Sequence, residues 1–244
     1  MGQALAEGLG GTDAFSVVAL VDVCEPRALF GARYAPSLVD IDASSIDVVI
    51  DFSTPEGVAD SASWCALHGV ALVIGATGLT SAQRVVVDEA ATKVGVVMAS
   101  NFSIGAVLAE RFAALAAPYF ESVEVIELHH DRKVDAPSGT SIAAAHAIEA
   151  ARATAGMEPI ANPTERLTID GARGADAGGG VRIHSVRLAG LVAHQEVLFG
   201  GPGEGLTIRH DTYDRSSFVP GVALAANAVD ATPRFLDGIA SLVN

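Results

Sequence analysis

The chain has 244 residues, half of them hydrophobic, and a formal net charge of −14 at pH 7. It can bury one large core or two smaller ones, and its acidity argues against nucleic acids and anionic membranes as partners, because both would repel it. Two cysteines, the absence of a signal-peptide pattern and the absence of an apolar run of the ~20 residues that span a bilayer favour the cytoplasm.

Short β-branched runs alternate with helical stretches in the first half of the chain. Buried strands are expected at 16–22, 47–52, 71–74 and 94–98. Helices are expected between them at 25–34, 57–68 and 81–93, and Thr54-Pro55-Glu56 and Thr80-Ser81 supply start signals for the last two. This alternation implies right-handed crossovers and a Rossmann-like α/β fold, a doubly wound parallel sheet with helices on both faces.

The chain opens on an expected amphipathic helix at 1–8, with no strand before it. In the dinucleotide-binding fingerprint G-x-G-x-x-G, the last glycine lies in the start of the first helix and allows it to pack closely on the sheet. Gly2 fits that place. We therefore expect that about ten residues, holding the first strand and the first glycines of the phosphate loop, are missing from this sequence, as a start codon misplaced at an internal Met would cause.

The second half has a different pattern. A helix is expected at 103–118, a strand at 122–129 and a helix at 138–154. After a glycine-rich loop at 171–180, polar and apolar residues alternate at 181–188, 194–199 and 206–211. Such strands form an open mixed sheet whose exposed face and edges favour pairing between subunits.

Two final helices, at 218–227 and 235–243, are expected to return to the first domain. The predicted domains are therefore a dinucleotide-binding domain, 1–102 with 217–244, and a substrate-binding and oligomerisation α+β domain, 103–216.

The densest polar cluster begins at the end of a predicted strand and contains His129, His130 and Lys133. Imidazoles titrate near neutral pH, and a lysine can give up its proton when its pKa is perturbed. Singly, His129 could be a half-buried strand histidine and Lys133 a solvated charge. Metal binding is ranked low and no metal is expected, because neighbouring histidines on a strand point to opposite faces.

The cluster continues into a predicted helix start at Ser138, Gly139 and Thr140. The free N–H groups and the dipole of a helix N-terminus favour an anion. Gly139 lets the backbone approach a ligand, and the two hydroxyls can donate to it or merely cap the helix. Together with the histidines and the lysine, this start predicts a catalytic site for a carboxylate substrate.

Two further segments follow predicted parallel strands, at the edge where open α/β sheets bind ligands. They are Gly75-Ala76-Thr77-Gly78 and Ala99-Ser100-Asn101-Phe102-Ser103. Asp22 ends another strand, where a carboxylate would accept hydrogen bonds from the ribose of NAD. A tight turn explains the glycines equally well, and a plain strand-ending aspartate explains Asp22 nearly as well.

These motifs resemble one family, 4-hydroxy-tetrahydrodipicolinate reductase, also called dihydrodipicolinate reductase. The resemblance covers essentially the whole chain and rests on E-L-H-H-x-x-K-x-D-A-P-S-G-T at 127–140, with support from 51–53, 75–78, 101–105 and 218–221. It implies that hydride from NADH or NADPH reduces a cyclic dicarboxylate, formed from pyruvate and aspartate semialdehyde, to tetrahydrodipicolinate with loss of water. This is a step of the diaminopimelate route to lysine.

The same resemblance implies roles for single residues. His129 would be the general acid/base and Lys133 the proton donor. Substrate contacts would come from His130, Ser138, Gly139, Thr140 and Thr77. Cofactor contacts would come from Asp22, Gly75, Ala76, Thr77, Ala99, Ser100, Asn101 and Phe102, in addition to Gly2, which the dinucleotide-binding fingerprint assigns. The family is typically a homotetramer built through the second-domain sheet. Ala76 and Ser141 depart from the family's usual Thr and Ala, and both changes are expected to be tolerated.

Two other functions stay open at this point. A noncatalytic dinucleotide-binding sensor would have no use for the proton-transfer groups, and the full run from Asp135 to Thr140 speaks against a related dehydrogenase such as aspartate dehydrogenase. The choice between NAD and NADP also stays open: Asp22 favours NAD by repelling a 2′-phosphate, while a basic residue in the expected missing loop could offset it.

Overall fold

The computed structural model describes residues 1–243 and divides into two compact units. Unit 1 comprises Met1–Ile104 and Arg215–Asn244, and unit 2 comprises Gly105–Asp214. Among the described residues, no helix is both long and apolar enough to cross a membrane.

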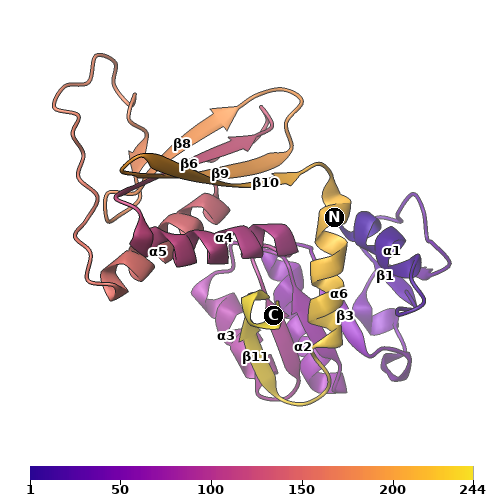
Figure 1. Cartoon of the computed structure of the whole chain (residues 1–244). Helices are drawn as coiled ribbons and strands as arrows, with labels where there is room; N and C mark the ends of the chain where they lie inside the picture. The colour runs from indigo at the N-terminus through magenta and orange to yellow at the C-terminus, as the bar shows by residue number, and fades with distance from the viewer. Residues whose placement is uncertain (244) are drawn as a thin grey trace. The chain divides into compact units, whose positions relative to one another are not determined.

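Unit 1 contains a four-stranded, fully parallel sheet in the order β11-β5-β4-β3 (Figure 1). The strands are β3 (Val48–Asp51), β4 (Ala71–Ile74), β5 (Gly95–Met98) and β11 (Arg234–Asp237). Helices α2 (Pro55–His68) and α3 (Ser81–Ala91) pack on each other and on the sheet, and α6 (Val219–Asn227) contacts β3 and β4. All four residues of β4 are buried, as expected of a central strand with both faces covered. The predicted doubly wound fold is confirmed.

Local signals set the ends of these helices. Thr54 caps α2 by accepting a hydrogen bond from the Gly57 N–H, and Gly69 ends it in a left-handed conformation. Thr80 and Gln83 form a reciprocal capping box at the start of α3.

The expected helix at 25–34 is wrong. This segment is irregular and ends in β2 (Arg33–Ala35), which pairs in parallel with β1 (Ala19–Val21) as a sheet of its own. Pro26 lies in the segment, and Phe30 and Gly31 both have positive φ, 49° and 86°. Consecutive left-handed residues reverse the chain and are incompatible with a right-handed helix. The short 3-10 turns η1 (Leu38–Asp40) and η2 (Ala43–Ser45) follow.

The opening helix is confirmed as α1 (Gly2–Gly10). The close packing expected of Gly2 is not seen, because a Cβ at this position would meet no atom within 4 Å. Gly8 is the closely packed glycine of this helix: a Cβ there would lie 2.5 Å from the Val219 side chain of α6.

The expected terminal helix at 235–243 is also wrong. Phe235 and Leu236 belong to β11, paired with Val96 and Val97 of β5, and the 3-10 turn η5 (Ala240–Leu242) follows. Gly238, with φ of 74°, makes the turn between β11 and η5. The apolar pair that suggested a helix therefore forms an edge strand.

Unit 2 holds a five-stranded mixed sheet in the order β10-β9-β6-β8-β7. The strands are β6 (Ser122–His129), β7 (Ala175–Asp176), β8 (Arg182–Arg187), β9 (Ala193–Gly201) and β10 (Glu204–Thr212). Strands β6 and β8 are parallel and the other pairs antiparallel, as predicted for a mixed sheet. The helices are α4 (Ile104–Ala116) and α5 (Gly139–Thr154), with 3-10 turns η3 (Ala117–Tyr119) and η4 (Arg215–Phe218), the last of these in unit 1.

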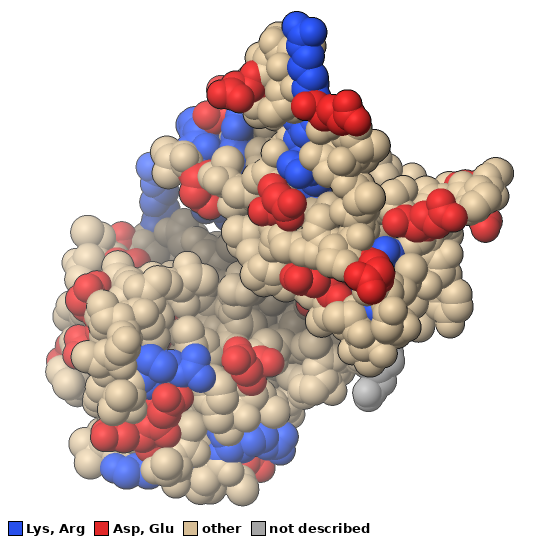
Figure 2. All heavy atoms as spheres, turned by 90° about the vertical axis from the view of Figure 1, so that its left-hand side faces the viewer, with Lys and Arg blue, Asp and Glu red and all other residues tan. Residues whose placement is uncertain are grey.

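One face of this sheet packs on α4 and α5 (Figure 1), through a core that includes Ala113, Ile148, Val125 and Val197. Side chains of the opposite face include charged pairs, such as Glu124 with Arg173 and Arg209 with Glu196. Acidic and basic side chains are interspersed in the view of Figure 2. The use of this sheet for oligomerisation stays a prediction.

Candidate active site

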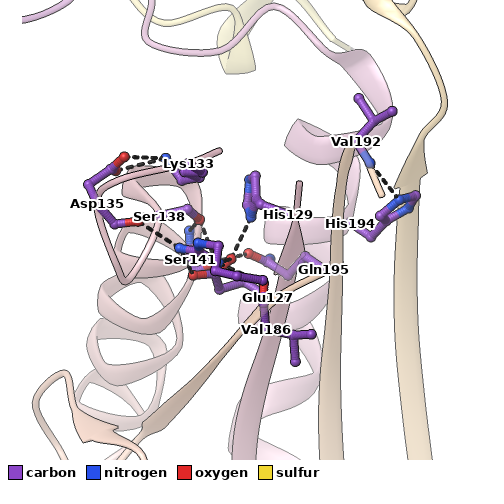
Figure 3. Close-up of polar contacts among 11 residues, drawn as sticks. Glu127, His129, Lys133, Asp135, Ser138, Ser141, Val186, Val192, His194 and Gln195 are labelled. Carbon is purple, nitrogen blue, oxygen red and sulfur yellow. Dashed lines mark hydrogen bonds and ion pairs between the residues drawn. The ribbon is translucent and has the colours of Figure 1, made fainter. Parts of the chain in front are cut away.

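The core of the site is a histidine held by a buried glutamate on β6. Glu127 and His129 are two residues apart, so they share the face of the sheet that carries Val123 and Val125. The Glu127 side chain is fully buried, and its Oε2 is hydrogen bonded to Nδ1 of His129 (Figure 3). An ionised carboxylate only accepts hydrogen bonds, so the neutral imidazole carries its proton on Nδ1 and its lone pair on Nε2.

The surroundings shift both groups. Burial by itself would raise the pKa of Glu127, but hydrogen bonds from Arg187, Ser185 and His129 outweigh it and hold that pKa below its ordinary value. Burial lowers the pKa of His129; the charges of Lys133 and Arg187 act in the same direction, while Glu127 opposes them. The site therefore contains an ionised carboxylate beside a neutral imidazole at neutral pH.

Lys133 lies in the loop after β6. Its Nζ donates to both carboxylate oxygens of Asp135, at 2.8 and 2.7 Å (Figure 3). The Lys133 hydrogen bond is the main cause of the lowered pKa of Asp135. The loop turns directly after β6, where the Lys133 N–H donates to the His130 carbonyl at 3.2 Å. His130 has a buried Nδ1 that lacks a hydrogen-bond partner among residues 1–243.

Helix α5 begins beside this loop. Ser138 caps it by accepting from the Ser141 N–H at 3.2 Å, and the two hydroxyls lie 2.7 Å apart. Ser141 in turn donates to Oε1 of Gln195 on β9 at 2.8 Å (Figure 3). A Cβ at Gly139 would meet no atom within 4 Å, so the first turn of α5 is open for a ligand. The predicted helix start is confirmed, with Ser138 as its cap, and its contacts to substrate stay predictions.

The two segments predicted to contact the cofactor lie together in unit 1. The 75–78 turn follows β4 and the 99–102 segment follows β5, and the Ala99 N–H donates to the carbonyl of Ile74 at 3.0 Å. Gly75 is required by packing, since a Cβ there would lie 2.1 Å from the Phe52 ring, and Gly78 turns with φ of 82° into open space. A glycine turn at the carboxyl edge of a parallel sheet fits a dinucleotide. Asp22 directly follows β1, a strand of the other sheet of the unit, and accepts from the Cys24 N–H.

The sequence did not reveal two polar residues of the unit 2 site, Arg187 and Gln195. It also did not reveal the part that Glu127 plays in this site. Arg187 binds both carboxylate oxygens of Glu127 at 2.8 Å. The available signal was the alternation on β6, which turns a glutamate toward an apolar core, where a carboxylate needs a cation. Among residues 1–243, no group of three or more His, Cys, Asp or Glu side chains is arranged to hold a metal ion.

Comparison with known proteins identifies the family. The family description "Dihydrodipicolinate reductase, N-terminus" matches residues 1–102, and "Dihydrodipicolinate reductase, C-terminus" matches residues 105–242. The chain belongs to the dihydrodipicolinate reductase family. Members of this family are NAD(P)H-dependent oxidoreductases of diaminopimelate and lysine biosynthesis. The reductase interpretation is thereby confirmed over the sensor and the related dehydrogenase.

Individual relatives agree. The 4-hydroxy-tetrahydrodipicolinate reductase of Corynebacterium diphtheriae is 45% identical over 232 residues, covering 94% of this chain and 88% of the relative. That of Mycolicibacterium vanbaalenii is 49% identical over 240 residues, covering 97% and 95%. A dipicolinate-bound dihydrodipicolinate reductase from Paenisporosarcina sp. TG-14 has a TM-score of 0.85 at 38% identity, covering 98% of this chain and 94% of that one. A probable dehydrogenase from Thermotoga maritima, 13% identical with a TM-score of 0.55, shares the fold.

Proposed function

We propose that the cluster on unit 2 binds the cyclic dicarboxylate substrate and that His129 and Lys133 handle its protons. The observation that carries this proposal is a neutral imidazole, oriented through Nδ1 by a buried carboxylate, on the same short stretch of chain as an ammonium and an open helix N-terminus. NAD(P)H, when bound, supplies the hydride. Lys133 donates the proton that completes the reduction, and His129 acts as general acid/base through Nε2.

The substrate carboxylates have a set of donors in unit 2. Gly139 and Thr140 lie in the first turn of α5, where the helix dipole stabilises an anion, and the space beside Gly139 is open. His130 contributes its unpartnered Nδ1 when that nitrogen is protonated. The Ser138 hydroxyl holds the turn in place as its cap. This local concentration of donors offsets the repulsion of a dianion by an acidic chain.

Unit 1 is proposed to hold the cofactor. The turn at 75–77 and the segment at 99–102 would line the nicotinamide, and Asp22 would accept hydrogen bonds from the adenosine ribose. Support comes from the adjacency of the two segments at the carboxyl edge of the sheet and from the open space at Gly78.

We also propose that the protein works in the cytoplasm as a homotetramer built through the sheet of unit 2. Support comes from the edge strand β10, whose residues 204–207 are exposed, because an uncovered edge favours pairing between subunits. Light scattering should give four times the chain mass of 24.8 kDa, and a monomeric mass would contradict the proposal.

Dipicolinate, the ligand of the related structure, tests the substrate site. Titration calorimetry in the presence of NADH should show binding to the wild type. Binding should weaken about 10- to 150-fold in Lys133→Ala, the effect of losing one hydrogen bond to a charged group. The matched control is Lys93→Ala, which removes the only other lysine of the chain, in unit 1. Equal affinity of Lys133→Ala and Lys93→Ala for dipicolinate would contradict the proposed site.

A further inference from the structure

Arg187 occupies a central place in the unit 2 site that no sequence motif revealed. It ends β8, directly opposite His129 in the parallel register of β6 and β8. Its Nη1 and Nη2 donate to the two oxygens of Glu127, each at 2.8 Å. Nη2 also donates to the backbone carbonyl of Asp135 at 2.7 Å, and Nη1 to that of Val186 at 2.8 Å. Since each Nη carries two hydrogens, all of them are used.

We propose that Arg187 is the positioning residue for both proton-transfer groups of the reductase. It holds His129 through the Glu127 carboxylate and the Lys133 loop through the Asp135 carbonyl. This inference rests on the roles proposed above for His129 and Lys133. Because one rigid, planar guanidinium makes both contacts, the imidazole and the lysine loop keep a fixed position relative to each other.

The first contact determines which nitrogen of His129 faces a ligand. The Glu127 side chain is fully buried, and a carboxylate in such a place stays ionised only with a well-placed cation. Arg187 is that cation. As long as Glu127 is ionised it can only accept, so the proton of neutral His129 stays on Nδ1 and Nε2 is presented for proton transfer. A protonated Glu127 could donate instead, and the tautomer would no longer be fixed.

The second contact fixes the loop that carries Lys133. The ion pair between Lys133 and Asp135 involves a carboxylate with 62% of its side chain exposed, and such surface pairs hold little by themselves. The hydrogen bond from Arg187 holds the backbone of Asp135 in place, and with it the carboxylate that pairs with Lys133. A lysine at position 187 could not replace this anchor, because its three donors radiate from a single nitrogen and cannot span Glu127 and Asp135 in the same way.

The first test is kinetic, with Arg187→Lys and Glu127→Gln. Arg187→Lys keeps the positive charge beside Glu127, and Glu127→Gln removes the buried negative charge, so neither variant leaves an unpaired carboxylate. For both, kcat should fall about 10- to 100-fold, the range known for losing the partner that orients a metal-bound histidine, while KM stays near the wild-type value. The matched control is Arg173→Lys, because Arg173 also pairs with a β6 glutamate, Glu124, away from His129. A wild-type kcat for Arg187→Lys would overturn the proposal.

The second test needs no turnover. Nitrogen-15 NMR of the histidines, with the His129 signal identified by its loss in His129→Asn, reports the tautomer directly. The wild type and Arg173→Lys should show the Nδ1–H form, and Arg187→Lys and Glu127→Gln a mixture. A fixed tautomer in Arg187→Lys would overturn the positioning role. If His129→Asn turns over like the wild type while the tautomers behave as expected, the proposed acid/base role fails and the orienting role stands.

The pH dependence of the His129 signal separates orientation from unfolding. The charged groups that face this imidazole are Glu127 from β6, Arg187 from β8 and Lys133 from the loop. Glu127 favours the imidazolium, so Glu127→Gln should lower the pKa of His129. A general loss of structure would instead move that pKa toward the value of an exposed histidine. An unchanged His129 pKa in Glu127→Gln would contradict the coupling on which the positioning role depends.

Discussion

The hydroxyl of Ser141 ties the first turn of α5 to β9, and its removal should loosen this part of unit 2. Ser141 is fully buried; its Oγ lies 2.7 Å from that of Ser138 and donates to Oε1 of Gln195 at 2.8 Å. Ser141→Ala leaves the buried Gln195 oxygen without this donor. An unsatisfied buried acceptor costs about 1–3 kcal/mol, which raises the equilibrium constant for local opening about 5- to 150-fold.

Hydrogen exchange followed by mass spectrometry measures this change, because peptides from α5 and β9 report their own opening free energies. Exchange in these two elements should accelerate by the stated factor, while α2 and α3 of unit 1 stay unchanged. The matched control is Ser63→Ala, whose exposed hydroxyl donates to the Ala59 carbonyl within α2 at 2.9 Å. Ser141→Ala combined with Gln195→Met should cost less than the two single changes added, because both partners are then apolar. If Ser141→Ala accelerates α5 exchange no more than Ser63→Ala accelerates α2 exchange, the Ser141 hydroxyl does not tie α5 to β9.

Three other predictions follow from the packing and charges. Gly221→Ala should destabilise unit 1 by about 1–3 kcal/mol, because the alanine Cβ would lie 1.8 Å from the Phe102 carbonyl oxygen. Urea unfolding followed by the fluorescence of Trp64 measures this change, and unchanged stability would refute this packing. Burial raises the pKa of Cys65 to about 12. A thiol reagent at pH 8 should therefore modify only the exposed Cys24 in the native protein, and both cysteines after unfolding. Rapid labelling of Cys65 in the native protein would contradict this prediction. The hydrogen bond from Arg173 lowers the pKa of Glu124, although burial alone would raise it. The ionised carboxylate therefore stabilises the fold at pH values above its ordinary pKa, and this stabilisation is lost as the pH falls through the lowered pKa. Acid titration of Glu124→Gln should show a smaller loss of stability than that of the wild type, and an equal loss would count against the Arg173–Glu124 pair.

Much of the fold follows from local sequence signals. The bounds of β4 and β6 match the expected strands 71–74 and 122–129, because both are β-branched runs whose ends carry clear turn or helix-start residues. The errors have a common cause. At 25–34 and 235–243 the apolar spacing resembled a helix, but left-handed residues at 30, 31 and 238 and pairing with distant strands decided the outcome. Such pairing is tertiary and overrides local propensity.

The candidate site divides in the same way. His129, Lys133 and the α5 start are contiguous in sequence, so their chemistry could be recognised from residue types alone. Arg187 and Gln195 come from β8 and β9, more than 50 residues beyond Lys133 in the chain, and reach the site only through strand register. The buried position of Glu127 implied a cation nearby, but the sequence offered many arginines and no way to choose among them.

The assignment of the reductase chemistry to the unit 2 cluster is the central claim, and steady-state kinetics test it most directly. NADH and NADPH oxidation are followed with substrate generated in place from pyruvate and aspartate semialdehyde by the preceding enzyme, for the wild type, Lys133→Ala and Lys93→Ala. Turnover is expected for the wild type and for Lys93→Ala, with a kcat about 10²- to 10⁴-fold lower for Lys133→Ala, the range for loss of a proton-transfer group. Wild-type turnover by Lys133→Ala would contradict the assignment of the chemistry to this cluster.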